Sequence, residues 1–234
     1  MKEPITWNLP RNNANDTAQS INPANPRAPV ARFTASSTRV ALGNKVLFSS
    51  TSTQNPDKLF WYLPDATPYF GKGSSIEATY NRVGYYDAYL LASNQFGSDS
   101  LWRKAYIEAF YFKSFADMDW EEWINDGWIF SSGQICDGCA LAWQNSGGAP
   151  KVMTLTRDFT DMPPSATLSF FYNIYSPGGY LRVRLNGAEI WTASSYGKGN
   201  TKIRIPYSGS YTLSFEAIVG YTQSIYLNDI ELRP

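Results

Sequence analysis

The chain of 234 residues contains no histidine. That absence removes the commonest general base, the commonest metal ligand and every Ser-His-Asp or Cys-His arrangement. Carboxylate chemistry remains, but a glycosidase needs two acids that face one cleft from opposite sides of a sugar. Glu121 and Glu122 are adjacent and point apart, so they do not form such a pair. The sequence predicts a protein that is not an enzyme, with a carbohydrate-active hydrolase as a weaker alternative.

Only two cysteines are present, Cys136 and Cys139, in the order Cys-Asp-Gly-Cys. These two cysteines would provide only half of the four ligands of a zinc site, because no histidine or second cysteine pair completes it. A thioredoxin-type redox motif needs a strand-to-helix junction, whereas this pair follows the Gly-rich segment 131–133. We therefore expect either a small disulfide loop or two free thiols.

Charge and long apolar runs are also scarce. Charged residues make up 17% of the chain, and the 20 basic and 20 acidic residues cancel. Without a basic block, neither a nucleic acid nor a charged membrane surface is an expected partner. No stretch approaches the roughly 18 apolar residues of a membrane span, and the first residues lack a signal-peptide core. Two explanations remain: a mature secreted or lipid-anchored protein whose leader and anchor lay upstream, or a virus structural protein.

Aromatic residues are abundant, with 8 Trp, 16 Tyr and 13 Phe. Such residues suit a pleated, half-buried surface, and the length is enough for two small sandwiches. We predict an all-β chain in three parts: an extended arm over residues 1–29, an immunoglobulin-like sandwich over 30–110 and a jelly roll over 111–234.

The arm is rich in asparagine and proline and has no apolar period. Proline cannot donate to a β-ladder, so an extended tether or spacer is expected. Trp7 and Leu9 are its only strong apolar side chains, and they make docking on a partner, or on the domains behind, the second possibility. The stretch Trp7–Asn13 is similar to mature N-termini of Bacteroidetes surface lipoproteins.

About seven short strand-like runs, separated by turn residues, follow in residues 30–110. The most characteristic pieces are Phe33–Ser36, Val46–Ser52, Trp61, the turn Tyr80–Tyr86 and the hairpin Ala92–Asp99. On these pieces the stretch resembles a PKD domain, an immunoglobulin-like spacer common in bacterial surface proteins. The resemblance implies a role in spacing and protein contact. Leu63–Ala66 stands where the family usually has Phe-Gly-Asp-Gly, so the turn after Trp61 must be built differently.

The rest of the chain begins with a short junction, residues 111–118, too short for a free linker. Trp120, Trp123 and Ile124 have helical spacing, which predicts one helical turn. Strand-like runs follow, and Asn186-Gly187 predicts a type I′ hairpin turn.

Four segments carry a second resemblance: Gly127-Trp128, Leu168–Tyr172, Leu181–Gly187 and Ile225–Leu232. They are similar to the jelly-roll domains of the concanavalin, MAM and carbohydrate-binding types. The resemblance implies an accessory module that binds a glycan or a protein.

A sugar site needs flat aromatic faces flanked by amides or carboxylates. The alternative for each strand tryptophan is a place in the core. Tyr175 and Tyr180 flank the turn at residues 176–179, and we expect them to form a further edge of such a site. The candidate ligand-binding residues are Trp143, Gln144, Asn145, Trp191, Tyr196, Asn200 and Tyr175.

No cofactor is expected, and one metal site is conceivable. Asp117, Asp119, Glu121, Glu122 and Asp126 form an acidic run that offers oxygen ligands for a structural Ca²⁺, with Asp229 arriving from the last strand. We favour a solvated acidic face instead, because no EF-hand spacing is present.

Two functions compete. The first is an extracytoplasmic binding or adhesion protein at a cell surface, with the arm as tether, the PKD-like part as spacer and the jelly roll in contact with a glycan or protein. The second is a structural subunit of a larger assembly, such as a phage virion decoration or fibre protein, whose arm orders against a partner subunit.

Overall fold

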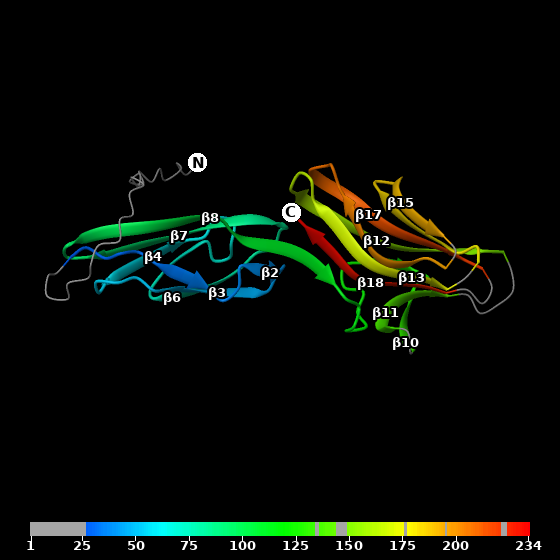
Figure 1. Ribbon diagram of the computed structural model, residues 1–234, viewed down its shortest axis with the longest axis horizontal. Coiled ribbons are helices and arrows are strands. Elements are labelled where there is room, and N and C mark those ends of the chain that lie inside the picture. The colour runs from blue at the N-terminus through cyan, green and yellow to red at the C-terminus, as the bar shows by residue number, and fades with distance from the viewer. Residues whose placement is uncertain (1–26, 134–135, 144–148, 176, 195, 221–223) are drawn as a thin grey trace, which may run out of the picture.

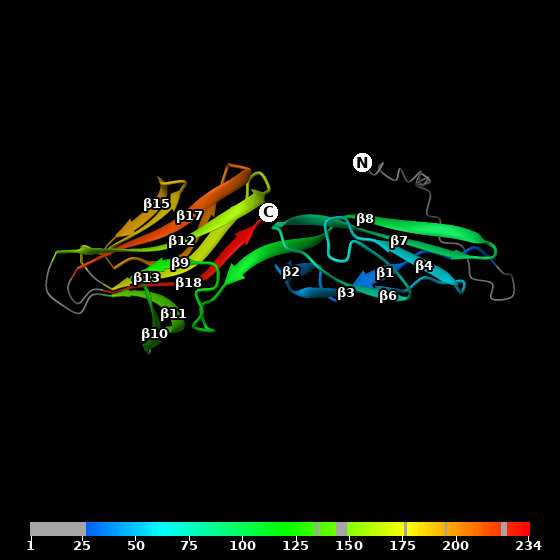
Figure 2. The ribbon, with the colours of Figure 1, turned by 180° about the vertical axis from the view of Figure 1, so that it is seen from behind.

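The computed structural model describes residues 27–133, 136–143, 149–175, 177–194, 196–220 and 224–234, without the side chains of 132, 133 and 136–138. Every regular element in these ranges is a β-strand. Figures 1 and 2 show the strands as two elongated lobes placed end to end. The predicted all-β class is confirmed. Nothing in these ranges is a helix with the length and apolar character that crossing a membrane requires.

Eight strands build the N-terminal lobe: β1 (Phe33–Ala35), β2 (Arg39–Ala41), β3 (Lys45–Ser50), β4 (Lys58–Tyr62), β5 (Phe70–Lys72), β6 (Ser75–Thr79), β7 (Gly84–Asn94) and β8 (Gly97–Lys113). One sheet has the order β1-β3-β6 and the other has β8-β7-β4-β5, with β2 parallel to β8. Two mainly antiparallel sheets with this order are the immunoglobulin arrangement.

Trp61 and Tyr86 hold the N-terminal lobe in the way that immunoglobulin-like domains do. The Trp61 ring is buried, lies 5.5 Å from the ring of Phe33 and donates from Nε1 to the carbonyl of Gly73 at 2.9 Å. The Tyr86 hydroxyl donates to the carbonyl of Arg82 at 2.7 Å, which is the tyrosine corner of this fold. The immunoglobulin-like prediction is confirmed.

The turn after Trp61 is indeed built without glycine. The N–H of Ala66 donates to the carbonyl of Leu63 at 3.2 Å, and Asp65 takes the left-handed conformation with φ 60°. Asp tolerates that region better than most residues, so the turn forms although Pro64 and Ala66 stand in place of the family's two glycines.

The C-terminal lobe contains β9 (Ile124–Asp126), β10 (Ile129–Gly133), β11 (Cys136–Trp143), β12 (Lys151–Met162), β13 (Thr167–Tyr175), β14 (Tyr180–Leu185), β15 (Ala188–Ser194), β16 (Lys198–Arg204), β17 (Gly209–Val219) and β18 (Ser224–Arg233). The order β10-β11-β18-β13-β16 forms one sheet and β15-β14-β17-β12-β9 the other. Strands β11 to β18 cross between two facing sheets, apart from the hairpin β14–β15 within one of them, and this is the predicted jelly roll. Asn186 and Gly187 both have positive φ, as a type I′ turn requires.

The helical turn expected near Trp120 is not formed. A single tight turn is present, in which the N–H of Trp123 donates to the carbonyl of Trp120 at 2.9 Å, and β9 begins at Ile124. The aromatic side chains take different partners: Trp120 stacks on Phe130 at 4.1 Å, and Trp123 is buried beside Tyr111. Packing of the two tryptophans against different elements overrides their helical spacing.

Strand β8 belongs to both lobes (Figure 1). It pairs with β7 through Ala109, and its last residues then pair with β18, with Tyr111 opposite Leu232 and Lys113 opposite Ile230. The expected junction over residues 111–118 therefore starts as strand, and one 10-stranded sheet runs through the molecule.

Ion pairs between charged side chains join the two lobes beside this shared sheet. Arg39 of β2 forms ion pairs with Glu231 of β18 and Glu108 of β8, and its guanidinium lies 4.0 Å from the ring of Phe110. Arg82 of the N-terminal lobe lies 3.3 Å from Asp161 of the other lobe. These cross-lobe pairs, together with the continuous strand, indicate a stiff connection.

Candidate functional site

One face of the sheet β10-β11-β18-β13-β16 points away from the core. Side chains alternate along a strand. Because Ile225 and Leu227 of β18 are buried, their neighbours Ser224, Tyr226 and Asn228 point outward. We use "outer face" for these outward residues: Leu141, Trp143, Ser224, Tyr226, Asn228, Phe171, Asn173, Tyr175, Lys198, Asn200, Lys202 and Arg204.

Two exposed aromatic residues flank Ser224 on the outer face. Trp143 of β11 and Tyr175 of β13 both stand opposite Ser224 in the ladders on either side of β18. Their exposed fractions are 44% and 47%. Neighbouring strands lie about 4.8 Å apart, so the two backbones are separated by about 10 Å with a small serine between them.

The next rows of the outer face add a third ring and amides. Tyr226 lies edge-on to Tyr175, with ring centroids 6.1 Å apart. Phe171 stands between Asn228 of β18 and Asn200 of β16. The Oδ1 of Asn228 is buried and accepts no hydrogen bond from any described residue. Because this oxygen has almost no accessible surface, the exposed amide of Asn200 and the part of Asn228 that reaches the surface are the groups a ligand hydroxyl can meet.

Tyr196 lies at the same end of the sheet as Tyr175. The N–H of Ile174 donates to the carbonyl of Gly197 at 2.8 Å, which extends the β13–β16 register toward Tyr196. Tyr196 is 68% exposed. The structure thus brings Trp143, Tyr175, Tyr196 and Asn200 to one sheet, while the predicted Gln144 and Asn145 lie outside the described residues.

Trp191 does not join this group. It stands opposite the inward residue Val183 and packs edge-on against Phe170 and Tyr172, at 5.1 and 5.0 Å between ring centroids. Its place is therefore the contact between the two sheets, which was the alternative considered for it. Tyr180 is on β14 of the opposite sheet, so it forms no edge with Tyr175.

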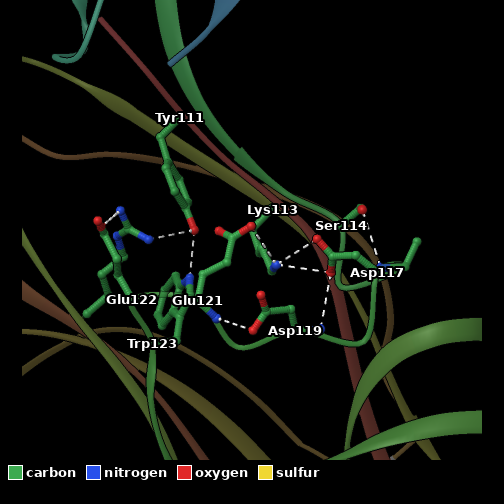
Figure 3. Close-up of polar contacts among 10 residues, drawn as sticks. Tyr111, Lys113, Ser114, Asp117, Asp119, Glu121, Glu122 and Trp123 are labelled. Atoms are coloured by element: carbon green, nitrogen blue, oxygen red, sulfur yellow. Dashed lines mark hydrogen bonds and ion pairs between the residues drawn. The ribbon is translucent and has the colours of Figure 1, made fainter. Parts of the chain in front are cut away.

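The acidic run after β8 is occupied by cations of the chain itself (Figure 3). Lys113 is 2% exposed, and its Nζ lies 3.0 Å from Asp117 Oδ1 and 3.1 Å from Glu121 Oε1. Its hydrogen bond holds the pKa of Asp117 below the usual value. Arg157 pairs with Glu122. All five carboxylates of the run are exposed, as a solvated acidic face predicts, and Asp117 and Glu121 also hold a buried ammonium group.

The described residues contain no group of three or more cysteine, aspartate or glutamate side chains placed to hold a metal ion. Asp229, the contributor to calcium binding expected from the last strand, sits in β18 with φ 52° and is exposed. Neither observation supports the calcium hypothesis.

Cys139 is buried on β11 and is disulfide-bonded. Of the two alternatives for the cysteines, the disulfide is the one formed. Cys136 begins the same strand, and its side chain lies outside the described ones.

A second aromatic surface lies on the N-terminal lobe. Phe60, Tyr62 and Phe70 are exposed on the outward side of β4 and β5, and Lys72 Nζ lies 5.2 Å from the ring centroid of Phe60. The outward positions of β4, β5, β7 and the first part of β8 contain no asparagine or glutamine. Rings without amides fit a sugar less well than the outer face does.

Comparison with known families identifies one part of the chain. Residues 31–107 match the model of the PKD domain. That range contains Trp61 and the Tyr86 corner, and it confirms the PKD resemblance for this third of the chain. No curated protein matches the sequence.

Several solved structures share some of the fold. A carbohydrate-binding module of the β-sandwich superfamily is 16% identical, with 90% of this chain and 100% of that one covered and a TM-score of 0.40. A second module, solved with β-1,4-galactotriose, is 11% identical over 51% of this chain and 92% of its own, with a TM-score of 0.41. An adhesin domain of Lys-gingipain from Porphyromonas gingivalis is 11% identical over 52% and 96%, with a TM-score of 0.43. Similarities this low carry no argument about a ligand.

Proposed function

We propose that this chain is a non-catalytic binding protein that works outside the cytoplasm and holds a glycan on the outer face of its C-terminal lobe. The observation that carries the proposal is the pair of exposed rings, Trp143 and Tyr175, on either side of Ser224. A pyranose has an apolar face that lies on such rings, and its hydroxyls need polar partners close by. The exposed amide of Asn200 and the partly exposed side chain of Asn228 supply them.

Three features support a location outside the cytoplasm. The disulfide of Cys139 is a bond that persists in oxidising compartments. The PKD match over residues 31–107 fits a spacer that carries the glycan-binding lobe away from a cell surface. The stiff junction through β8 suits such a spacer, because it keeps the outer face at a fixed position relative to the N-terminal lobe.

The proposal of a non-catalytic role rests on the fate of the acidic residues. Glu121 and Glu122 pair with Lys113 and Arg157 at the junction, not on the outer face. The carboxylate of Glu231 on β18 is held by Arg39 and Arg233. These three groups are thus committed to ion pairs rather than free to protonate a glycosidic oxygen.

The direct test is binding to a panel of soluble polysaccharides by affinity electrophoresis and calorimetry. Tyr175→Ala is expected to weaken binding about tenfold, which is ~1.4 kcal/mol. Tyr180→Ala is the matched control, since it removes an exposed tyrosine from the opposite sheet. Equal effects of the two variants, or no binding to any polysaccharide, would end the proposal.

The alternative is a structural subunit, and the exposed Phe60, Tyr62 and Phe70 favour it, since patches of this kind often meet a protein. It predicts an oligomer that dissociates when Phe60→Ser and Phe70→Ser are combined. A monomer at all concentrations in light scattering would count against it.

A further inference from the structure

Positive charge gathers on β16, at one edge of the sheet that carries the outer face. Lys198, Lys202 and Arg204 point outward there, on either side of Asn200. In the described part of the chain none of these three cations pairs with a carboxylate, and Arg204 donates only to Ser165 Oγ, at 2.9 Å. Because the whole chain has 20 basic and 20 acidic residues, this is a local segregation of charge.

Protection of a sheet edge is the usual reason for such lysines, since charge discourages pairing with another strand. The other edge strands of this lobe carry less charge: β9 and β15 hold one acidic residue each, Asp126 and Glu189, and β10 holds no charged residue. Edge protection alone therefore leaves the concentration of cations on β16 unexplained.

Carboxylates are kept away from β16. The outward positions of the neighbouring strand β13 hold uncharged residues, including Phe171, Asn173 and Tyr175. The nearest acidic residues in this sheet are Asp229 and Glu231 on β18, with β13 in between, and Glu231 is held by arginines. A ligand charge above β13 and β16 would meet cations and no carboxylate of its own sign.

The cations lie within reach of a sugar on the aromatic rings. Lys198 stands opposite Asn173, which stands opposite Tyr226, which stands opposite Leu141. This row crosses four strands, or about 14 Å, so a saccharide that covers Tyr226 extends toward the ammonium group of Lys198. Lys202 lies two rows further along the same strand.

We propose, on the basis of the proposed function, that the glycan held by the outer face is acidic and that its carboxylate or sulfate groups pair with Lys198 and Lys202. The aromatic rings give affinity for the sugar, and the lysines select charged polymers over neutral ones. Attraction between such exposed groups is screened by salt, which gives the proposal a clear signature.

Three pairs of probes separate charge from backbone: polygalacturonate and its methyl ester, carboxymethylcellulose and hydroxyethylcellulose, and dextran sulfate and dextran. The full chain is titrated with each polymer at about 0.05 M and about 0.5 M NaCl. We expect at least one charged member to bind about tenfold more tightly than its neutral counterpart at low salt, and that advantage to shrink at high salt. The first two pairs identify a carboxylate ligand and the third a sulfate.

The variant Lys198→Gln/Lys202→Gln is expected to remove the preference for the charged member, so that the charged and neutral members bind with the same affinity. Lys45→Gln/Lys58→Gln is the control, because it removes the same charge from the N-terminal lobe. Tyr175→Ala is expected to weaken both members, which distinguishes a sugar site from simple ion exchange.

The outcomes separate the two proposals. If neutral and charged members bind equally and Tyr175→Ala weakens both, the acidic-glycan proposal is wrong and the glycan-binding function stands. If charged polymers bind but Tyr175→Ala has no effect, or if no polymer binds, both proposals fail.

Discussion

Trp143 and Tyr175 stand opposite the same residue, Ser224, from the two sides of β18. They lie 32 positions apart in the chain, at 143 and 175, yet the ladders place them in one row across the sheet. A small side chain between two exposed rings leaves the space above β18 open to a ligand that spans both. This arrangement is the basis of the function proposed for the chain.

Filling the position between the rings is expected to block that ligand. Ser224→Leu places a bulky side chain between Trp143 and Tyr175, so glycan binding weakens about tenfold while the melting temperature is unchanged. Thr192→Leu on the exposed side of β15 is the control. Calorimetric titration of the two variants checks this, and unaltered affinity in Ser224→Leu would show that the ligand does not bridge the rings.

The tyrosine corner of the N-terminal lobe is expected to contribute measurable stability. Tyr86→Phe removes the hydrogen bond to the Arg82 carbonyl and lowers the free energy of unfolding by about 1 kcal/mol. Tyr85→Phe, at the exposed neighbouring position, leaves it unchanged. Urea unfolding distinguishes the two, and equal midpoints would mean that the Tyr86 hydroxyl bond is not stabilising.

Because the ammonium group of Lys113 is buried, the stability lost on mutating the junction depends on which partner of the ion pair is removed. Asp117→Ala/Glu121→Ala leaves the charge of Lys113 buried without a partner and is expected to cost about 3 kcal/mol. Lys113→Met removes the charge, keeps the apolar stem and frees two exposed carboxylates, so its cost is smaller. Glu77→Ala breaks an exposed pair with Lys45 and is expected to have the smallest effect of the three. Thermal unfolding gives the order, and a larger loss in Lys113→Met would contradict it.

Stability is expected to be flat near neutral pH and to fall on both sides. Hydrogen bonds from Lys113 hold the pKa of Asp117 low. Burial of Asp87 opposes its ionisation, but hydrogen bonds from Lys104, Trp102 and the Ala105 N–H still lower its pKa. A depressed folded-state pKa stabilises the protein above the unfolded value of about 3.9, and this stability is lost as the pH falls through the folded-state pKa.

The alkaline limit comes from buried tyrosines. Burial raises the pKa of Tyr111 to about 12, so its contribution is complete below the unfolded value of about 10 and is lost as the pH rises toward 12. Because the chain has no histidine, no side chain with an ordinary pKa titrates in between. Free energies of unfolding measured from pH 5.5 to 8.5 should agree to within about 1 kcal/mol. A steep dependence on pH in that range would refute the assignment of these groups.

The sequence predicts the strands and both sandwich types because alternation and turn residues are local signals. Trp143 points outward because Ala140 and Ala142 fill the inward positions beside it; the alternation is visible in the sequence, but it does not say which of its two faces is buried. Trp191 is different: it points inward because its register partner Val183 does, and the register of an edge strand is not a local property. The same reason hides Tyr226 and Asn228, whose neighbours on β11 and β13 are far away in the chain.

The junction was the least predictable part of the fold. The pairing of Tyr111 with Leu232 joins positions near the middle and the end of the chain, and no local pattern signals it. The sequence likewise predicts a solvated acidic face, but no local pattern indicates that Lys113 is buried against it.

The most direct test of glycan binding on the outer face is nuclear magnetic resonance of the labelled chain during titration with an oligosaccharide from a polymer that it binds. The account predicts that the indole N–H of Trp143 and the amides of β13, β16 and β18 shift, while those of β14 and β17 and the indole of Trp102 do not. Shifts confined to β14 and β17, or to Trp102 and the aromatic surface of the N-terminal lobe, would contradict it.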